Sequence, residues 1–154
     1  MLKISCTSEK ALLLFARKFS NFLKVGTYIY LEGNLGAGKT TFARGVLQGY
    51  GYKGIVKSPT YTLVETYHIK NKCINHFDLY RVAHPEELEF IGIREYFTPE
   101  AICLIEWPNH GVSVIPAPSI RLQFSSFARG RIIEGIACTP LGEELLMSLK
   151  EDNV

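Results

Sequence analysis

The sequence predicts an α/β fold of three layers around a mixed sheet. A β-branched and aromatic run, residues 27–31, is followed at once by a glycine-rich loop and a helical pattern. Residues 101–105 are apolar throughout, as in a central strand covered on both faces. Two further pairs of strand-like runs are each joined by three residues, which is typical of antiparallel hairpins. We therefore expect a parallel core with antiparallel hairpin additions.

The first two helices follow from capping and periodicity. Ser8 and Glu9 open a helix that ends before Gly26, because a capping hydroxyl and an acid suit a helix N-terminus. A second helix begins near Lys39, after the glycine-rich loop, and two glycines stop it. The apolar residues expected to be buried at helical spacing are Leu12, Phe15, Ala16, Phe19 and Leu23, then Phe42, Ala43, Val46 and Leu47.

The later elements alternate hairpins with single strands and helices. In chain order we expect strands at 61–69 and 73–79, a helix beginning at Pro85, a strand at 101–105, strands at 119–127 and 131–138, and a helix at 141–149. Ligands of such sheets bind beyond the carboxyl ends of the parallel strands.

Composition limits the class of protein. The 154 residues suggest a single domain, 1–154, and 47% hydrophobic residues suffice for a core. The net charge of 17 − 15 = +2 argues against a basic face that grips nucleic acid. Four cysteines without a Cys-x-x-Cys pair suggest reduced thiols and a cytoplasmic protein. The apolar runs are too short to span a membrane, and the histidines lack zinc-site spacing.

The glycine-rich loop matches the phosphate-binding pattern G-x-x-x-x-G-K-[ST], so the fold is expected to be of the P-loop NTPase type. Lys39 is expected to reach the β- and γ-phosphates, and Thr40 to hold Mg²⁺. Thr41 can bond an α-phosphate oxygen. The residues predicted to bind the nucleotide are Gly33, Asn34, Gly36, Ala37, Gly38, Lys39, Thr40 and Thr41.

Two predicted strands end in an acid, Asp78 and Glu106. If both strands run parallel to the strand before the loop, the carboxylates meet at one edge beside the phosphates. Either can bind Mg²⁺ or orient the attacking water. Thr60, in the Ser-Pro-Thr segment 58–60, is a further candidate for contact with Mg²⁺ or the γ-phosphate.

Four other side chains have simpler interpretations. Trp107 is expected to be a packed core aromatic, with exposure for a partner or stacking on the loop as the alternatives. Arg129 and Arg131 are expected at a solvated hairpin tip, with an approach to the nucleotide as the alternative. Arg81, just after the acid of the preceding strand, is a better candidate for a contact at the catalytic edge or with a partner.

The residues favour ATP over GTP. Segment 71–74 has Ile74 where a guanine-specific Asn-Lys-x-Asp signature ends in Asp, and segment 78–81 has Arg81 where a GTPase switch has Gly. A small-molecule kinase stays possible, although no arginine-rich lid is evident. A non-hydrolysing module that binds ATP is a third alternative, against which the two strand-end acids argue weakly.

The combined motifs resemble the bacterial TsaE (YjeE) family over nearly the whole chain. They are the glycine-rich loop, Ser-Pro-Thr at 58–60, His-Phe-Asp-Leu-Tyr-Arg at 76–81 and Glu-Trp at 106–107. The resemblance implies an ATPase of tRNA threonylcarbamoyladenosine biosynthesis that works with TsaB and TsaD and meets tRNA through them.

The resemblance also implies residue roles. Lys39 and Thr40 correspond to the phosphate and Mg²⁺ residues, Glu106 to a second Mg²⁺ contact, and Asp78 to a carboxylate at the active edge. The family places its N-terminal segment near the base, which points to Thr7 or Ser8.

Overall fold

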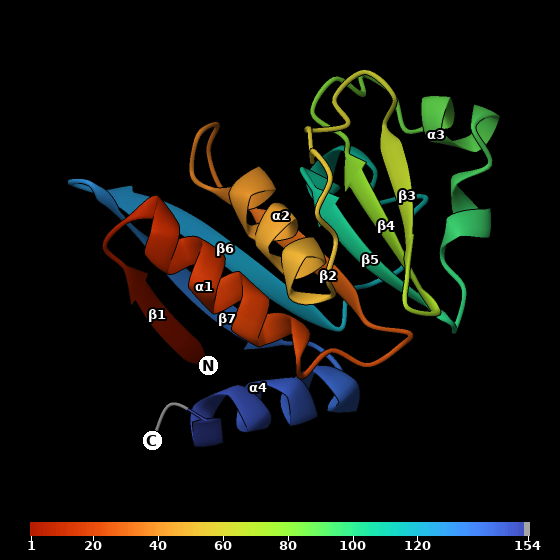
Figure 1. Ribbon diagram of the computed structural model, residues 1–154. Helices are drawn as coiled ribbons and strands as arrows, with labels where there is room; N and C mark the ends of the chain where they lie inside the picture. Colours follow the sequence, from red (N-terminus) through yellow and green to blue (C-terminus); the bar gives the residue numbers. More distant parts are fainter. Residues whose placement is uncertain (153–154) are drawn as a thin grey trace.

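A single seven-stranded sheet organises the protein, as described by a computed structural model of residues 1–152 (Figure 1). The strand order across the sheet is β1-β7-β6-β2-β5-β4-β3. The strands are β1 (Leu2–Cys6), β2 (Tyr28–Glu32), β3 (Val64–Ile69), β4 (Lys72–Asp78), β5 (Ala101–Glu106), β6 (Ile120–Phe127) and β7 (Gly130–Ala137). The helices are α1 (Glu9–Ser20), α2 (Lys39–Gly49), α3 (Glu86–Phe90), α4 (Pro140–Asp152) and the 3₁₀ turns η1 (Ile93–Tyr96) and η2 (Pro108–His110).

Strand directions confirm the predicted mixed sheet. The inner strands β6, β2, β5 and β4 are mutually parallel. Antiparallel partners complete both sides, with β3 hairpinned to β4 and β7 hairpinned to β6, while β1 pairs with β7. Both predicted hairpins are therefore present, and the α/β fold class is confirmed.

The two faces of the sheet carry different cores. Strand side chains alternate between faces, so Ile29 and Leu31 of β2 join a core with α1, α2 and α4, while Tyr30 joins the opposite one. Figure 1 shows α1 and α2 side by side across one face. Loops and the short helices α3, η1 and η2 cover the other face. The predicted three layers follow from this division.

Helices α1 and α2 approach closely because their contact contains small residues. A Cβ added to Gly45 would lie 2.5 Å from the Cβ of Ala16. The predicted cap is confirmed, since the Ser8 hydroxyl accepts the Ala11 N–H at 3.0 Å. All nine apolar residues predicted for the inner faces of these two helices and the turn after α1 are buried.

Two features differ from the expected elements. Strand β1 is not among the predicted elements, although Leu2 and Cys6 are buried and alternate with exposed residues. Strand β3 begins at Val64 rather than at residue 61, because Leu63 adopts a positive φ of 71° that interrupts extended backbone. Within residues 1–152, no helix has the length and apolar character needed to cross a membrane.

Candidate functional site

The glycine-rich loop joins β2 to α2 and is shaped by its glycines. Gly33, Gly36 and Gly38 have positive φ angles of 146°, 77° and 108°, which suit glycine. A Cβ at Gly33 would lie 2.5 Å from the Phe124 carbonyl oxygen, so any side chain there would collide with β6. No side chain caps α2. The first N–H groups of α2 and its partial positive charge are thus available to an anion.

Lys39 is the first residue of α2 and is held inside the site. Its ammonium group donates to the Gly33 carbonyl oxygen at 2.5 Å and lies 3.7 Å from the centre of the Trp107 ring. Burial lowers the pKa of this ammonium, while the carboxylates of Glu106 and Asp78 partly oppose that change. The cation is therefore poised between the loop and the two strand-end acids.

Trp107 is a partly buried residue rather than a fully packed core aromatic. Its ring packs against the core on the sheet face opposite α1 and α2. The same ring makes a cation–π contact with the Lys39 ammonium. Its φ of 56° is rare for a bulky residue and directs the chain into η2 immediately after β5. The favoured expectation of a packed core aromatic is therefore wrong in part, and the alternative of a ring beside the loop describes its contact with Lys39 better.

Glu106 ends β5 and is only 3% exposed. The Thr40 hydroxyl donates to this carboxylate, at 3.0 Å from Oε1 and 2.9 Å from Oε2. On the other side, Nε2 of His76 lies 2.7 Å from Oε2. These contacts compensate a buried carboxylate and join the start of α2 to the end of β5.

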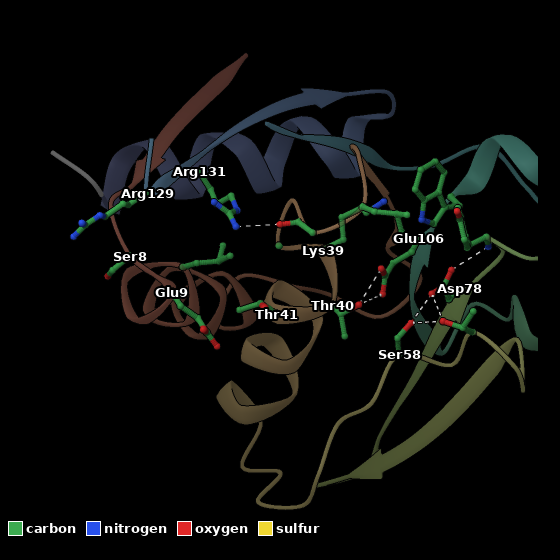
Figure 2. Close-up of a pocket in the computed structure, with 17 residues that line it drawn as sticks. Ser8, Glu9, Lys39, Thr40, Thr41, Ser58, Asp78, Glu106, Arg129 and Arg131 are labelled. Atoms are coloured by element: carbon green, nitrogen blue, oxygen red, sulfur yellow. Dashed lines mark hydrogen bonds between the residues drawn. The ribbon is translucent and has the colours of Figure 1, made fainter. Parts of the chain in front are cut away.

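Asp78 ends β4 and holds a loop in place. Its Oδ2 accepts from the hydroxyls of Ser58 at 2.5 Å and Thr60 at 3.0 Å, and its Oδ1 accepts from the Tyr80 N–H at 3.0 Å. Figure 2 shows these hydrogen bonds beside the separate pair formed by Thr40 and Glu106. Thr60, predicted to contact Mg²⁺ or phosphate, is thus bonded to the neighbouring acid in this structure.

The register of the sheet explains why the two acids meet. Asp78 is paired with Glu106 across the parallel strands β4 and β5. Both follow by even steps from residues that face α2, Ile74 and Ile102, so both point toward the start of that helix. The predicted meeting of the strand ends at one edge is confirmed.

A cleft of about 450 Å³ lies in front of these groups. Lys39, Thr40 and Thr41 line it together with both carboxylates, Ser58 and Thr60. Arg131 of β7 also lines it and donates from Nη2 to the Gly36 carbonyl oxygen at 3.0 Å (Figure 2). The expected solvated hairpin tip is wrong for Arg131, because its side chain extends from β7 to the glycine-rich loop and contacts Gly36.

Comparisons with known proteins agree with this architecture. A family model described as "Threonylcarbamoyl adenosine biosynthesis protein TsaE" matches residues 6–133. The chain belongs to the TsaE family.

Named TsaE proteins are similar along most of their length. The chain is 52% identical over 143 residues to the tRNA threonylcarbamoyladenosine biosynthesis protein TsaE of Haemophilus influenzae, covering 90% of each. It is 36% identical over 136 residues to the protein of that name from Bacillus subtilis, covering 88% of this chain and 84% of the relative. The crystal structure of YdiB from B. subtilis superposes with a TM-score of 0.82 at 29% identity, covering 99% and 96% of the two chains.

The region matched by the TsaE family model includes every residue predicted to act at the site. Both strand-end acids and the whole glycine-rich loop lie within it. Within the loop, Gly36, Gly38 and Lys39 line the cleft, whereas Ala37 is buried and its N–H closes a turn on the Asn34 carbonyl oxygen at 3.1 Å. Of the two N-terminal residues suggested by the resemblance to lie near the base, Ser8 lines the cleft and Thr7 does not.

Arg81 lies apart from the cleft of this TsaE family member. Its guanidinium stacks 4.3 Å from the centre of the Tyr61 ring and donates to the Tyr61 hydroxyl at 3.0 Å. A direct place at the catalytic edge is therefore not observed for Arg81, while its suggested contact with a partner stays a prediction.

Two side chains at the site, His76 and Ser58, had no role predicted from the sequence, and a third, Arg131, was expected mainly at a solvated tip. His76 carried a signal, since it stands two residues before Asp78 on a strand and must point to the same face. Ser58 carried a weaker signal, its position in the Ser-Pro-Thr segment 58–60. Arg131 reaches Gly36 across 95 residues of chain, which local spacing cannot reveal.

Proposed function

We propose that this chain binds ATP with Mg²⁺ and hydrolyses it in tRNA threonylcarbamoyladenosine biosynthesis, the process of its family. The observation that carries this proposal is the meeting of Lys39 and Thr40 with two strand-end carboxylates in one cleft. A phosphate cradle alone supports binding, and the adjacent acids extend this to hydrolysis.

The loop suits a polyphosphate. Free N–H groups at the start of α2 and the Lys39 ammonium supply positive charge where the glycines leave space for phosphate oxygens. The cleft volume lies within the range of nucleotide-sized ligand sites. We favour ATP because neither guanine-specific signature is present in the sequence.

The oxygen atoms near Thr40 suit Mg²⁺. No cluster of three His, Cys, Asp or Glu side chains within residues 1–152 could hold a metal ion without other ligands. This fits Mg²⁺, which proteins usually bind through one or two groups together with phosphate and water. We assign Thr40 and Glu106 to this ion, which would neutralise charge on the phosphates.

The two carboxylates can also position and activate the attacking water. Glu106 and Asp78 carry acceptor oxygens at the strand edge, where either can orient a water molecule or receive its proton. Thr60 shares Oδ2 of Asp78 with Ser58, so movement of this loop would change which groups that acid contacts. We propose that the 58–60 loop responds to the γ-phosphate.

Turnover by the isolated chain should be slow. Arg129 and Arg131 lie at the Gly36 end of the cleft, away from Asp78 (Figure 2). An arginine beside the transferred phosphate typically provides a large rate gain. We propose that TsaB and TsaD complete or reshape the site, and that tRNA meets this chain through them in the cytoplasm.

The test is a phosphate-release assay with and without the TsaB–TsaD pair. Stimulation by the pair supports the proposal, whereas fast saturable turnover by the chain alone contradicts its dependence on partners. Transfer of phosphate to a small metabolite would instead indicate a kinase. Tight ATP binding without turnover in either mixture would indicate a binding module.

A further inference from the structure

His76 is a buried histidine that lies directly behind the candidate site. It belongs to β4, its side chain is fully buried, and its Nε2 lies 2.7 Å from Oε2 of Glu106. Its other ring nitrogen, Nδ1, is buried and has no hydrogen-bond partner among residues 1–152. His76 does not line the cleft, whereas Glu106, its hydrogen-bond partner, does.

The hydrogen-bond pattern determines which nitrogen carries the proton. An ionised Glu106 carboxylate can only accept, so with Glu106 ionised the short contact places a proton on Nε2. Nδ1 is then a bare acceptor rather than an unpaired N–H donor. This arrangement agrees with its lack of a partner, because orphaned buried N–H groups are rarer than under-satisfied acceptors.

The hydrogen bond to Glu106 also sets the direction of the Thr40 hydroxyl. A hydroxyl has one proton and two lone pairs, and Thr40 gives its proton to Glu106. Its lone pairs are thereby left for a cation in the cleft. The direction of this hydroxyl depends on the position of the Glu106 carboxylate, which depends in turn on the imidazole behind it.

We propose that His76 is a positioning residue: its Nε2–H fixes the Glu106 carboxylate and, through it, presents the Thr40 oxygen to the bound cation. The inference rests on the proposed Mg²⁺ site for its functional consequence. Residues that orient metal-binding groups commonly change metal affinity about 10- to 100-fold when they are replaced.

The main test measures the affinity of a non-hydrolysable ATP analogue by calorimetry, with Mg²⁺ and with EDTA. His76→Phe should reduce the gain in affinity that Mg²⁺ provides about tenfold or more, while affinity in EDTA stays within about twofold. His76→Gln keeps an N–H at a similar reach and should retain most of the gain.

Phe77→Leu is the matched control. Phe77 is fully buried on the same strand but faces the opposite core, so this change weakens packing away from Glu106. It should lower the melting temperature and leave the Mg²⁺-dependent gain intact. Equal losses of that gain in His76→Phe and Phe77→Leu would overturn the proposal.

A second measurement needs no nucleotide and works even if His76→Phe does not fold. Long-range ¹H–¹⁵N spectra of the ligand-free wild-type protein report which imidazole nitrogen is protonated. A proton on Nε2 supports the positioning role, and a proton on Nδ1 alone overturns it. If Mg²⁺ gives the wild type no gain in affinity, the proposed Mg²⁺ site fails, while this spectrum still decides the arrangement of His76 and Glu106.

Discussion

The ends of β4 and β5 carry similar acids, side by side, with different neighbours. Asp78 and Glu106 are paired in register and are both nearly buried. Glu106 is bonded to the first turn of α2 and to a core histidine. Asp78 is bonded to Ser58 and Thr60 on a loop without regular structure.

This difference suggests a division of labour. The partners of Glu106 belong to a helix and a strand, so its position is set by rigid elements. Two partners of Asp78 belong to a connecting segment, which can move at lower cost than a helix or strand. Glu106 is thus suited to hold a fixed ligand, and Asp78 to follow a change in the loop.

The largest effect is expected from Lys39→Ala, which removes the cation that both acids face. ATP affinity should fall by about 2–5 kcal/mol, or about 30- to 4000-fold. Calorimetry of ATP binding checks this, with the exposed Lys53→Ala as the control. Unchanged affinity would show that Lys39 does not bind phosphate. The two acids could then no longer be compared by their contact with a shared phosphate-binding cation.

Glu106→Gln should slow ATP turnover about 100-fold, because it removes a carboxylate from the proposed site of hydrolysis, and should leave ATP affinity in EDTA little changed. Glu32→Gln is the matched control, since Glu32 also ends a parallel strand but pairs with Arg121 outside the cleft. Parental turnover by Glu106→Gln in the assay with partners would refute the assigned role.

Asp78→Asn should slow turnover about tenfold, again with binding largely retained. It should also loosen residues 57–60, because an amide accepts the two hydroxyls less strongly than a carboxylate. Hydrogen exchange of this loop measures the second effect. If Glu106→Gln loosens the loop as much, the two strand ends do not act separately.

Ser58→Ala should destabilise the fold by only about 0.5–1 kcal/mol, since Thr60 and the Tyr80 N–H still bond the acid. Urea unfolding measures this loss against Ser126→Ala, an exposed serine of β6. A loss above about 3 kcal/mol would show that the loop is a structural part of the strand end.

The smallest effect concerns pH. Carboxylates stabilise the Lys39 ammonium and raise its pKa, with Glu106 contributing more than Asp78. Neutralising either acid removes that support, so the pKa of Lys39 falls further and ATP affinity declines at a lower pH. Titrations of affinity toward alkaline pH should show a larger displacement for Glu106→Gln than for Asp78→Asn. The reverse order would contradict the geometry.

Local patterns were enough to predict most of the framework. The loop from Gly33, the α1 cap at Ser8 and the hairpins depend on neighbouring residues, and the meeting of Asp78 with Glu106 follows from parallel strand direction. The contacts of Arg131 with Gly36 and of Trp107 with Lys39 join residues far apart in the sequence. The spacing of residues within one segment cannot predict such contacts. Strand β1 is different. Its sequence alternates apolar and polar residues as a strand does, but over only five residues, which is a weak signal.

Strand β1 also constrains the order in which the protein can be completed. Leu2 pairs with Gly135, so 135 − 2 = 133 positions separate the partners. A ribosome makes the chain from its N-terminus, and these partners cannot meet until β7 has emerged. The Arg131 contact with Gly36 waits for the same strand. A nascent chain therefore contains the whole glycine-rich loop long before the wall of its cleft exists, and ATP would meet a finished pocket only after β7 has emerged.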